Sequence, residues 1–198
     1  MKWTFFALLI YALFFAPGQG GMEDPILQAF LSGEFGKLDP LVTMVFSFLG
    51  IFPFFWTALY FRSDQYAVPA WPFALLSFGL GAFALLPYLF FRKKEKKARP
   101  RVQNIGYALS SRWAMLTLLL ITLFLYIYGL LFGSFSGYKE AFLQSSLVSV
   151  MTVDFLLLVI YSWWWIRKEA PGKEWLCFFP LSGALIACAI SLRKDRQR

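Results

Sequence analysis

A strongly basic segment near the middle of the chain, from Arg92 to Arg101, constrains the fold more than any other feature. Seven of its ten residues are lysine or arginine, and burying that much charge in hydrocarbon or in a protein core is costly. The segment must therefore lie at a surface between the two hydrophobic halves of the chain. Basic clusters beside apolar segments typically contact anionic lipid headgroups. The residues expected to make these contacts are Arg92, Lys93, Lys94, Lys96, Lys97, Arg99 and Arg101.

The composition of the two halves indicates a membrane protein. Of the 198 residues, 59% are hydrophobic and 21% are aromatic, and the mean hydropathy is +0.60. Soluble domains are nearer to about 45–50% apolar. The net charge of +8 is concentrated in the basic segment and in the C-terminal residues 193–198. Nucleic-acid binding is the alternative reading of this charge, but no soluble binding module accompanies it. We therefore expect lipid and other membrane proteins as partners, and no nucleic acid.

The reactive residue types argue against an enzyme. The chain has no histidine, which removes the commonest general base and metal ligand. Its two cysteines, Cys177 and Cys188, are eleven residues apart, or about 16 Å along a helix, too far for a disulfide within that helix. No phosphate-binding loop or paired carboxylate motif is present. We expect no catalytic residue, no metal and no cofactor.

The apolar segments predict an all-α membrane protein with about six transmembrane helices, because a hydrocarbon core requires about 20 helical residues per crossing. The expected helices run from Trp3 to about Ala16, Leu41 to Phe61, Pro69 to Phe91, Trp113 to Phe132, Leu143 to Ile166 and Trp175 to Leu192. Tryptophans open or close most of them, as is typical of interfacial anchors.

Two of the connections and the first helix need separate interpretation. The first apolar segment follows Lys2 and is similar to a secretory signal, but its counterpart at Trp113 favours a retained helix. Between the first two spans, the segment from Pro25 to Phe35 predicts a short interfacial helix. The small residues from Gly133 to Gly137 are typical of a loop.

The two halves align in order, which predicts an internal repeat. Residues 1–91 form the first unit, 92–112 a basic linker and 113–198 the second unit. The matched positions are Trp3 with Trp113, Ala29-Phe30-Leu31 with Ala141-Phe142-Leu143, Arg62 with Arg167, Trp71 with Trp175, and Gly81-Ala82 with Gly183-Ala184. Three helices per unit is an odd number, so we expect the second unit to have inverted topology. Alternating spans then place the basic segment in the cytoplasm or stroma, with both termini on the opposite side.

Asp154 is the candidate intramembrane polar site, because it is the one ionisable residue well inside a predicted span. A carboxyl group there usually faces a partner or a water-filled cavity. It serves either as a proton or cation site, or as a hydrogen-bonded packing residue that joins helices. Elsewhere, Asp39-Pro40 predicts a helix N-cap followed by proline. The glycines at 79, 81 and 183 are interpreted as helix-packing positions.

Two stretches resemble known families. Residues 39–53, with Val68-Pro69-Ala70-Trp71-Pro72-Phe73 and Gly81 to Tyr88, resemble an uncharacterised family of cyanobacterial and plastid membrane proteins. Asp154 to Trp165, with Arg167, Trp175 and Arg193-Lys194, is similar to a family of small three-helix bacterial membrane proteins of unknown function. Neither resemblance implies an activity. The first implies a thylakoid or plastid membrane. Without that resemblance, we expect a bacterial inner membrane.

These observations leave two functional hypotheses. The first is a non-enzymatic scaffold, assembly or interaction factor that acts through lipid and protein contacts. The alternative is a small carrier or proton-coupled transporter that uses Asp154. Polar side chains that converge on Asp154 would favour the carrier, and a dry apolar surround would favour the scaffold.

Overall fold

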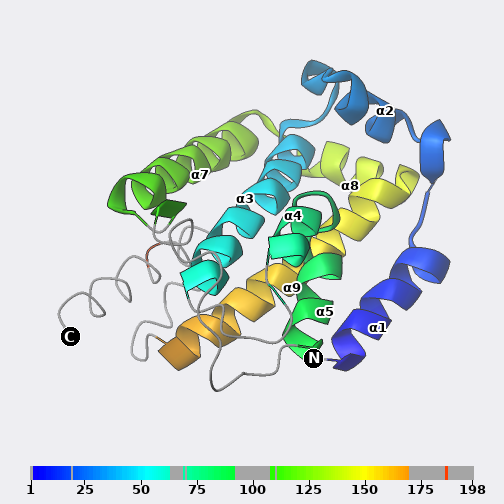
Figure 1. Ribbon diagram of the computed structural model, residues 1–198. Helices are drawn as coiled ribbons and strands as arrows, with labels where there is room; N and C mark the ends of the chain where they lie inside the picture. Colours follow the sequence, from blue (N-terminus) through cyan, green and yellow to red (C-terminus); the bar gives the residue numbers. More distant parts are fainter. Residues whose placement is uncertain are drawn as a thin grey trace.

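The computed structural model describes residues 2–18, 20–62, 69, 71–91, 108–109, 111–169 and 186, and their regular secondary structure is helical (Figure 1). The elements are α1 (Lys2–Ile10), a π-helical turn η1 (Tyr11–Phe15), η2 (Gly21–Glu23), α2 (Pro25–Ser32), η3 (Phe35–Lys37), α3 (Pro40–Arg62), α4 (Trp71–Leu80), α5 (Ala82–Phe91), α7 (Arg112–Phe132), α8 (Phe135–Gln144) and α9 (Ser146–Glu169).

Three of the described helices are long and apolar enough to cross a membrane, namely α3, α7 and α9. They confirm the helices that the sequence predicts over 41–61, 113–132 and 143–166. The first apolar segment is also helical, but it is shorter, from Trp3 to Phe15. The predicted sixth span lies outside the described residues, apart from Ile186, which packs against the main hydrophobic core.

A short helix is present where the sequence predicts one after the first span, and this helix, α2, runs from Pro25 to Ser32. The prediction of a loop at 133–137 is wrong, because helix α8 begins at Phe135. The Ser134 hydroxyl accepts a hydrogen bond from the Gly137 N–H at 3.3 Å and caps this helix. Both short helices lie at the same end of the bundle, which we call the short-helix end (Figure 1).

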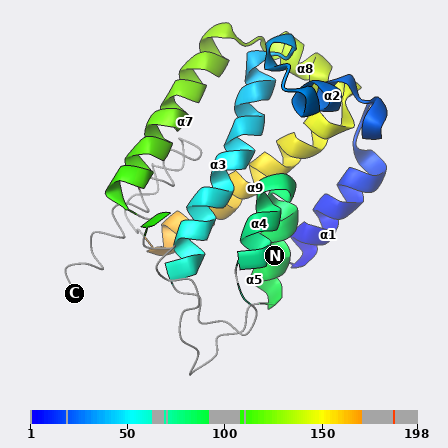
Figure 2. The same ribbon diagram turned by 45° about the horizontal axis from the view of Figure 1, so that its top comes forward.

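The predicted third span is not one helix but a helical hairpin that turns at Gly81. The φ angle of Gly81 is +51°, a left-handed conformation that ends α4 and redirects the chain into α5. The rings of Phe73 and Tyr88, eight residues before and seven after the turn, have centroids 5.4 Å apart. The two arms therefore lie antiparallel, and both outer ends of the hairpin point away from the short-helix end (Figure 2).

The hairpin changes the relation between the two halves. At the short-helix end, Asp39 before α3 accepts a hydrogen bond from the Ser134 N–H after α7, and Asp24 accepts one from the Ser145 hydroxyl before α9. Helices α1 and α7 therefore both run toward this end, and α3 and α9 both run away from it (Figures 1 and 2). The inverted topology that the sequence predicts is not confirmed: in the described residues α1 runs in the same direction as α7, and α3 in the same direction as α9.

Helices α3 and α9 pack side by side in the same direction at the centre of the bundle. The ring centroids of Phe48 and Phe155 are 6.0 Å apart, and those of Trp56 and Tyr161 are 4.5 Å apart. These pairs are separated by 107 and 105 residues in the sequence, which is close to the offset that aligns the two halves. Their contacts form part of the main hydrophobic core, which draws residues from both halves.

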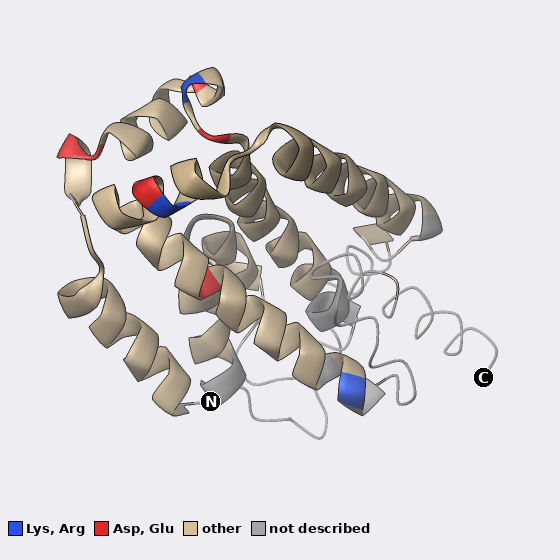
Figure 3. Ribbon diagram, turned by 180° about the vertical axis from the view of Figure 1, so that it is seen from behind, with Lys and Arg blue, Asp and Glu red and all other residues tan. Residues whose placement is uncertain are grey.

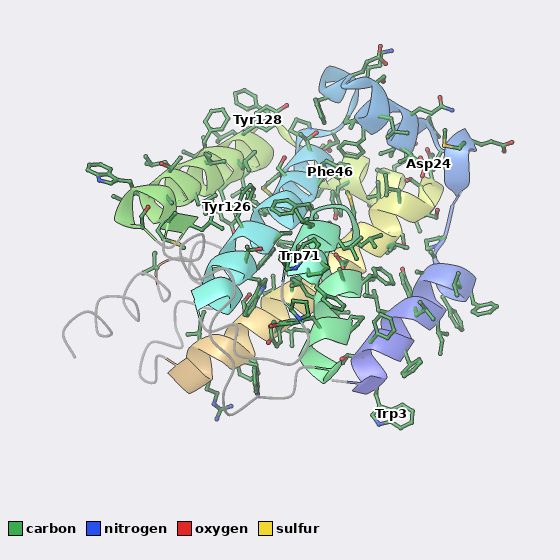
Figure 4. The ribbon with its side chains drawn as sticks, viewed as in Figure 1. Trp3, Asp24, Phe46, Trp71, Tyr126 and Tyr128 are labelled. Carbon is green, nitrogen blue, oxygen red and sulfur yellow. The ribbon has the colours of Figure 1, made fainter. Side chains whose placement is uncertain are left out.

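Two strongly exposed tryptophans lie at the end of the bundle opposite to α2 and α8. Trp3 opens α1 and is 85% exposed, and Trp113 near the start of α7 is 81% exposed. In Figure 4 Trp3 projects outward from one end of the bundle, while Asp24 lies at the other end. Trp56, by contrast, is fully buried in the core.

The turn at Gly81 can be tested by giving it a side chain. Gly81→Ala is expected to lower the thermal unfolding midpoint in detergent, because a left-handed residue with a Cβ is strained by about 1–2 kcal/mol. The new Cβ would also overlap the Asp154 carboxylate. Circular dichroism at 222 nm measures the transition.

Gly50→Ala is the matched control. A Cβ at Gly50, inside α3, meets no atom within 4 Å. Alanine stabilises a helix interior by about 0.5–1 kcal/mol relative to glycine, so this variant should be as stable as the parent or more so. Equal midpoints for the two variants would contradict the role of the turn.

Candidate functional site at the tip of the helical hairpin

The candidate site is the contact between Asp154 on α9 and the first residue of α5. Both carboxylate oxygens of Asp154 accept a hydrogen bond from the Ala82 backbone N–H, at 2.9 and 3.2 Å. The two residues are almost completely buried, with 4% and 1% of their surfaces exposed. The first N–H groups of a helix have no partner within the helix, and its N-terminus carries a partial positive charge. Asp154 therefore caps α5 from another helix.

The residue between the arms makes this approach possible. The Gly81 N–H donates to the Ser77 carbonyl at 2.9 Å and so completes α4. Its own carbonyl accepts from the N–H groups of Ala84 and Leu85, at 3.3 and 3.4 Å, and so begins α5. Because a Cβ at Gly81 would overlap the Asp154 carboxylate, only glycine allows α9 to lie this close. Gly81 is thus a position of close helix approach, as the sequence predicts, although it lies at the turn between α4 and α5 and not inside one continuous helix.

In the part of the chain that the structure describes, Asp154 is buried and contacts the hairpin through Ala82. Its hydrogen bonds there come from Ala82, and the core residues Leu85, Leu86 and Leu158 lie in the cluster around the hairpin. No group of three histidines, cysteines or acids in the described residues could hold a metal ion. Asp154 lies eight residues, or about 12 Å, into α9. Chemically, the site holds one carboxylate against one helix N-terminus.

A second set of polar contacts, at the short-helix end, ties the two halves together. Asp24 caps α2 through the N–H of Ile26 at 2.9 Å and accepts from the Ser145 hydroxyl at 2.5 Å. Ser145 in turn caps α9, where its oxygen accepts from the Val148 N–H at 3.2 Å. Asp24 and Ser145 are each 1% exposed. One hydrogen bond thus joins the N-cap of the short helix of one half to the N-cap of the long helix of the other.

A second pair of helix N-caps, Asp39 and Ser134, joins the two halves in the same way. Asp39 caps α3 through the Leu41 N–H at 2.8 Å, as the sequence predicts, and its second oxygen accepts from the Ser134 N–H at 3.1 Å. Ser134 is the N-cap of α8. We call these four residues the cap exchange. Sequence reasoning missed Asp24, although Asp24-Pro25 repeats the Asp39-Pro40 pattern that identified the cap of α3.

Two tyrosines extend these contacts along α9. The Tyr11 hydroxyl lies 2.6 Å from the Ser149 hydroxyl, and the Tyr138 hydroxyl lies 2.6 Å from the Thr152 hydroxyl. Burial raises the pKa of Tyr138, and its hydrogen bond with Thr152 lowers the pKa by less. The Tyr138 phenol therefore stays neutral at physiological pH and remains able to donate this bond.

The other predicted site residues are not brought to this location. The seven lysines and arginines expected to contact lipid headgroups lie outside the described residues, as does Gly183. Gly79 lies in α4, two residues before the turn.

Comparison of the chain with protein-family models, with curated proteins and with solved structures found no match. The resemblances to a cyanobacterial and plastid family and to small three-helix bacterial proteins therefore stay predictions.

The cap exchange can be tested with a double-mutant cycle. Asp24→Ala and Ser145→Ala should each destabilise the protein by about 1 kcal/mol or more, because each removes an N-cap. Since the two side chains share one hydrogen bond, the double variant should show a coupling energy of about 0.5–3 kcal/mol. Denaturant unfolding in detergent micelles measures the three variants.

Thr117→Ala is the control partner for Asp24→Ala. The Thr117 hydroxyl donates to the Trp113 carbonyl of its own helix, near the start of α7 and far from the short-helix end. Its effect should add to that of Asp24→Ala without coupling. A coupling energy near zero for Asp24 with Ser145 would contradict the exchange.

The capping of α5 by Asp154 can be tested by substitution of Asp154. Asp154→Leu removes the acceptor and leaves the buried Ala82 N–H without a partner, which should cost about 1–3 kcal/mol. Asp154→Asn retains an acceptor oxygen, so its thermal midpoint should lie between those of the parent and the leucine variant. A leucine variant as stable as the parent would contradict the capping role.

Proposed function

We propose that the protein is an integral membrane protein without a catalytic role, which acts as a scaffold, assembly or interaction factor through lipid and protein contacts. The observation that carries the proposal is the engagement of Asp154. Both of its oxygens accept the Ala82 N–H, so the one acid inside a long apolar helix is committed to holding the fold together. This favours the packing interpretation of Asp154 over a proton or cation site.

The exposed surface of α7 supports a role in which the protein binds lipid or other membrane proteins. Only 17% of the stretch Trp113–Phe132 in α7 is buried, against 61% of the stretch Pro40–Thr57 in α3. Its open face carries a stripe of large apolar side chains at helical spacing, formed by Leu116, Leu120, Phe124, Ile127 and Leu131. The opposite face packs closely on α3, where a Cβ at Gly129 would press against the Met44 side chain. We propose that other membrane proteins bind this stripe and displace the lipid chains that otherwise cover it.

The arrangement in the membrane follows from the helix lengths. We propose that α3, α7 and α9 each cross the bilayer, and that α1 with η1 crosses as a shorter element in a locally thinned region. The arms of the α4–α5 hairpin have ten residues each, or about 15 Å, which is half of a hydrocarbon core of about 30 Å. The hairpin therefore enters and leaves on one side. Six full crossings, as expected from the sequence, would require this segment to span.

The carrier alternative is favoured by one observation, the position of the hairpin tip. The N-terminus of α5 lies inside the bundle, where it meets a carboxylate from the other half. Broken helices that meet near the midplane, between related halves, form the substrate sites of several transporter folds. In this alternative, Asp154 would bind and release a proton or a cation as the tip moves.

Reconstituted vesicles distinguish the two functions. The scaffold proposal predicts that the parent protein shows no pH-driven proton or cation flux above empty vesicles, and that Asp154→Asn changes only its thermal stability. Flux by the parent that Asp154→Asn abolishes, in a protein that still folds, would overturn the scaffold proposal in favour of the carrier. Asp39→Asn is the control, since Asp39 is a carboxylate at the short-helix end that also accepts backbone N–H groups.

A further inference from the structure

Helix α8 has three different faces along its length, because residues three or four apart share one side of a helix. The face that packs against the hydrophobic cluster between α3 and α9 is formed by Tyr138, Ala141 and Phe142. The second face is exposed and is formed by Phe135, Lys139 and Leu143. The third face is exposed and polar, and it is formed by Ser136, Glu140 and Gln144. The part of α8 that does not pack is therefore largely apolar on one side and polar on the other.

Helix α2 has the same division of faces. Its packing face is formed by Ile26, Ala29 and Phe30. Its exposed polar face is formed by Gln28 and Ser32, and Leu31 beside them is 68% exposed. The sequence aligns Ala29-Phe30-Leu31 of α2 with Ala141-Phe142-Leu143 of α8. In both helices the phenylalanine packs against the same cluster and the leucine is exposed, so the matched positions have matched surroundings.

The exposed apolar residues of the short helices continue onto the sides of the long helices. Phe135 of α8 comes three residues after Phe132 at the end of α7, and the two are 80% and 71% exposed. At α2, the Phe30 ring is stacked on the Phe46 ring of α3, with centroids 3.8 Å apart, and it contacts the Phe35 ring at 5.9 Å. The apolar surface is thus continuous from the short-helix end to the helices that we propose to cross the bilayer.

Charged residues mark the level at which this apolar surface stops. In Figure 3 the charges of the described chain gather at the two ends of the bundle, and the ribbons between the ends are almost uncharged. Beside α2, Lys37 pairs with Glu34 at 2.8 Å. On α8, Lys139 lies between Phe135 and Leu143, where the aliphatic part of a lysine can cover apolar surface while its ammonium group reaches polar surroundings.

We propose that α2 and α8 lie in the headgroup layer of one leaflet and bind lipid there. Leu31, Phe135 and Leu143 insert among the ends of the acyl chains nearest the headgroups, and the polar faces of both helices are turned to water. Amphipathic helices bind membrane surfaces by burying an apolar face at the boundary between headgroups and acyl chains. This inference rests on the proposed insertion of α3, α7 and α9 in the bilayer. Since apolar insertion carries the binding, zwitterionic phosphatidylcholine is sufficient as the lipid.

Spin labels on adjacent residues test this placement. The full-length protein with Cys177→Ala and Cys188→Ala receives one cysteine at a time, which carries a nitroxide. The variants on the apolar faces are Leu31→Cys and Leu143→Cys. The matched controls, each at the next residue and on a polar face, are Ser32→Cys and Gln144→Cys. All four positions are exposed, so these variants should fold.

A fifth label, at Leu120→Cys, is the reference for membrane insertion, because Leu120 is 66% exposed near the middle of α7. Each protein is reconstituted in phosphatidylcholine vesicles. Power-saturation electron paramagnetic resonance then compares the collision rates of each nitroxide with oxygen, which concentrates in hydrocarbon, and with a water-soluble nickel chelate.

The proposal predicts a higher ratio of oxygen to chelate collisions at Leu31→Cys than at Ser32→Cys, and at Leu143→Cys than at Gln144→Cys. The ratios of the two leucine variants should lie below that of Leu120→Cys, because their labels are nearer to water. Equal ratios within either pair would overturn the paired arrangement. Labels at both leucine positions that neither reagent reaches would overturn it in favour of a protein partner, such as a second copy, on these faces.

The Leu120→Cys label separates failure of this inference from failure of the proposed function. If the chelate reaches this label as readily as it reaches the label at Ser32→Cys, membrane insertion fails, and the proposed function fails with it. If oxygen alone reaches the Leu120→Cys label while both leucine labels of the short helices are in water, insertion stands and the interfacial placement alone is overturned.

Discussion

The hydrogen bond between Asp154 and the Ala82 N–H is the interaction on which the rest of the arrangement depends. A helix that starts inside an apolar bundle exposes N–H groups that no water can reach, and leaving them unpaired is costly. Asp154 supplies the acceptor from α9, and the left-handed turn at Gly81 supplies the room. Together they allow an apolar segment of 21 residues, from Trp71 to Phe91, to fold back on itself rather than continue as one helix.

That single turn decides how the two halves are related. With a straight third helix, the second half would begin at the opposite end of the bundle and run in the inverted direction. With a hairpin, it begins at the same end as the first, so α3 and α9 pack in parallel and their aromatic residues meet in matched pairs. The cap exchange at the short-helix end follows from this arrangement, since it requires the starts of α2, α3, α8 and α9 to lie together. The two halves of the chain are thus joined through their N-caps as well as through a shared core.

Much of the local structure could be predicted from the sequence. The lengths of α3, α7 and α9, the short helix α2 and the Asp39 cap all follow from apolar run length and from the preference of aspartate and proline for helix starts. The site could be predicted only in part. Asp154 stands out as a lone acid in an apolar span, but its partner is a backbone N–H 72 residues away, which no side-chain pattern encodes. The helix α8 was missed because its small residues near Gly133 and Gly137 are equally typical of a loop.

The sequence by itself determined which segments are apolar, how long the helices are, where several of them begin and where the positive charge is concentrated. These properties depend on composition and on neighbours within a few residues. Only the tertiary structure decided the direction in which α7 and α9 run relative to α1 and α3. The physical reason is that a glycine in an apolar run fits a straight helix and a left-handed turn almost equally well. The choice at Gly81 is made by a carboxylate that reaches it from a helix in the other half of the chain.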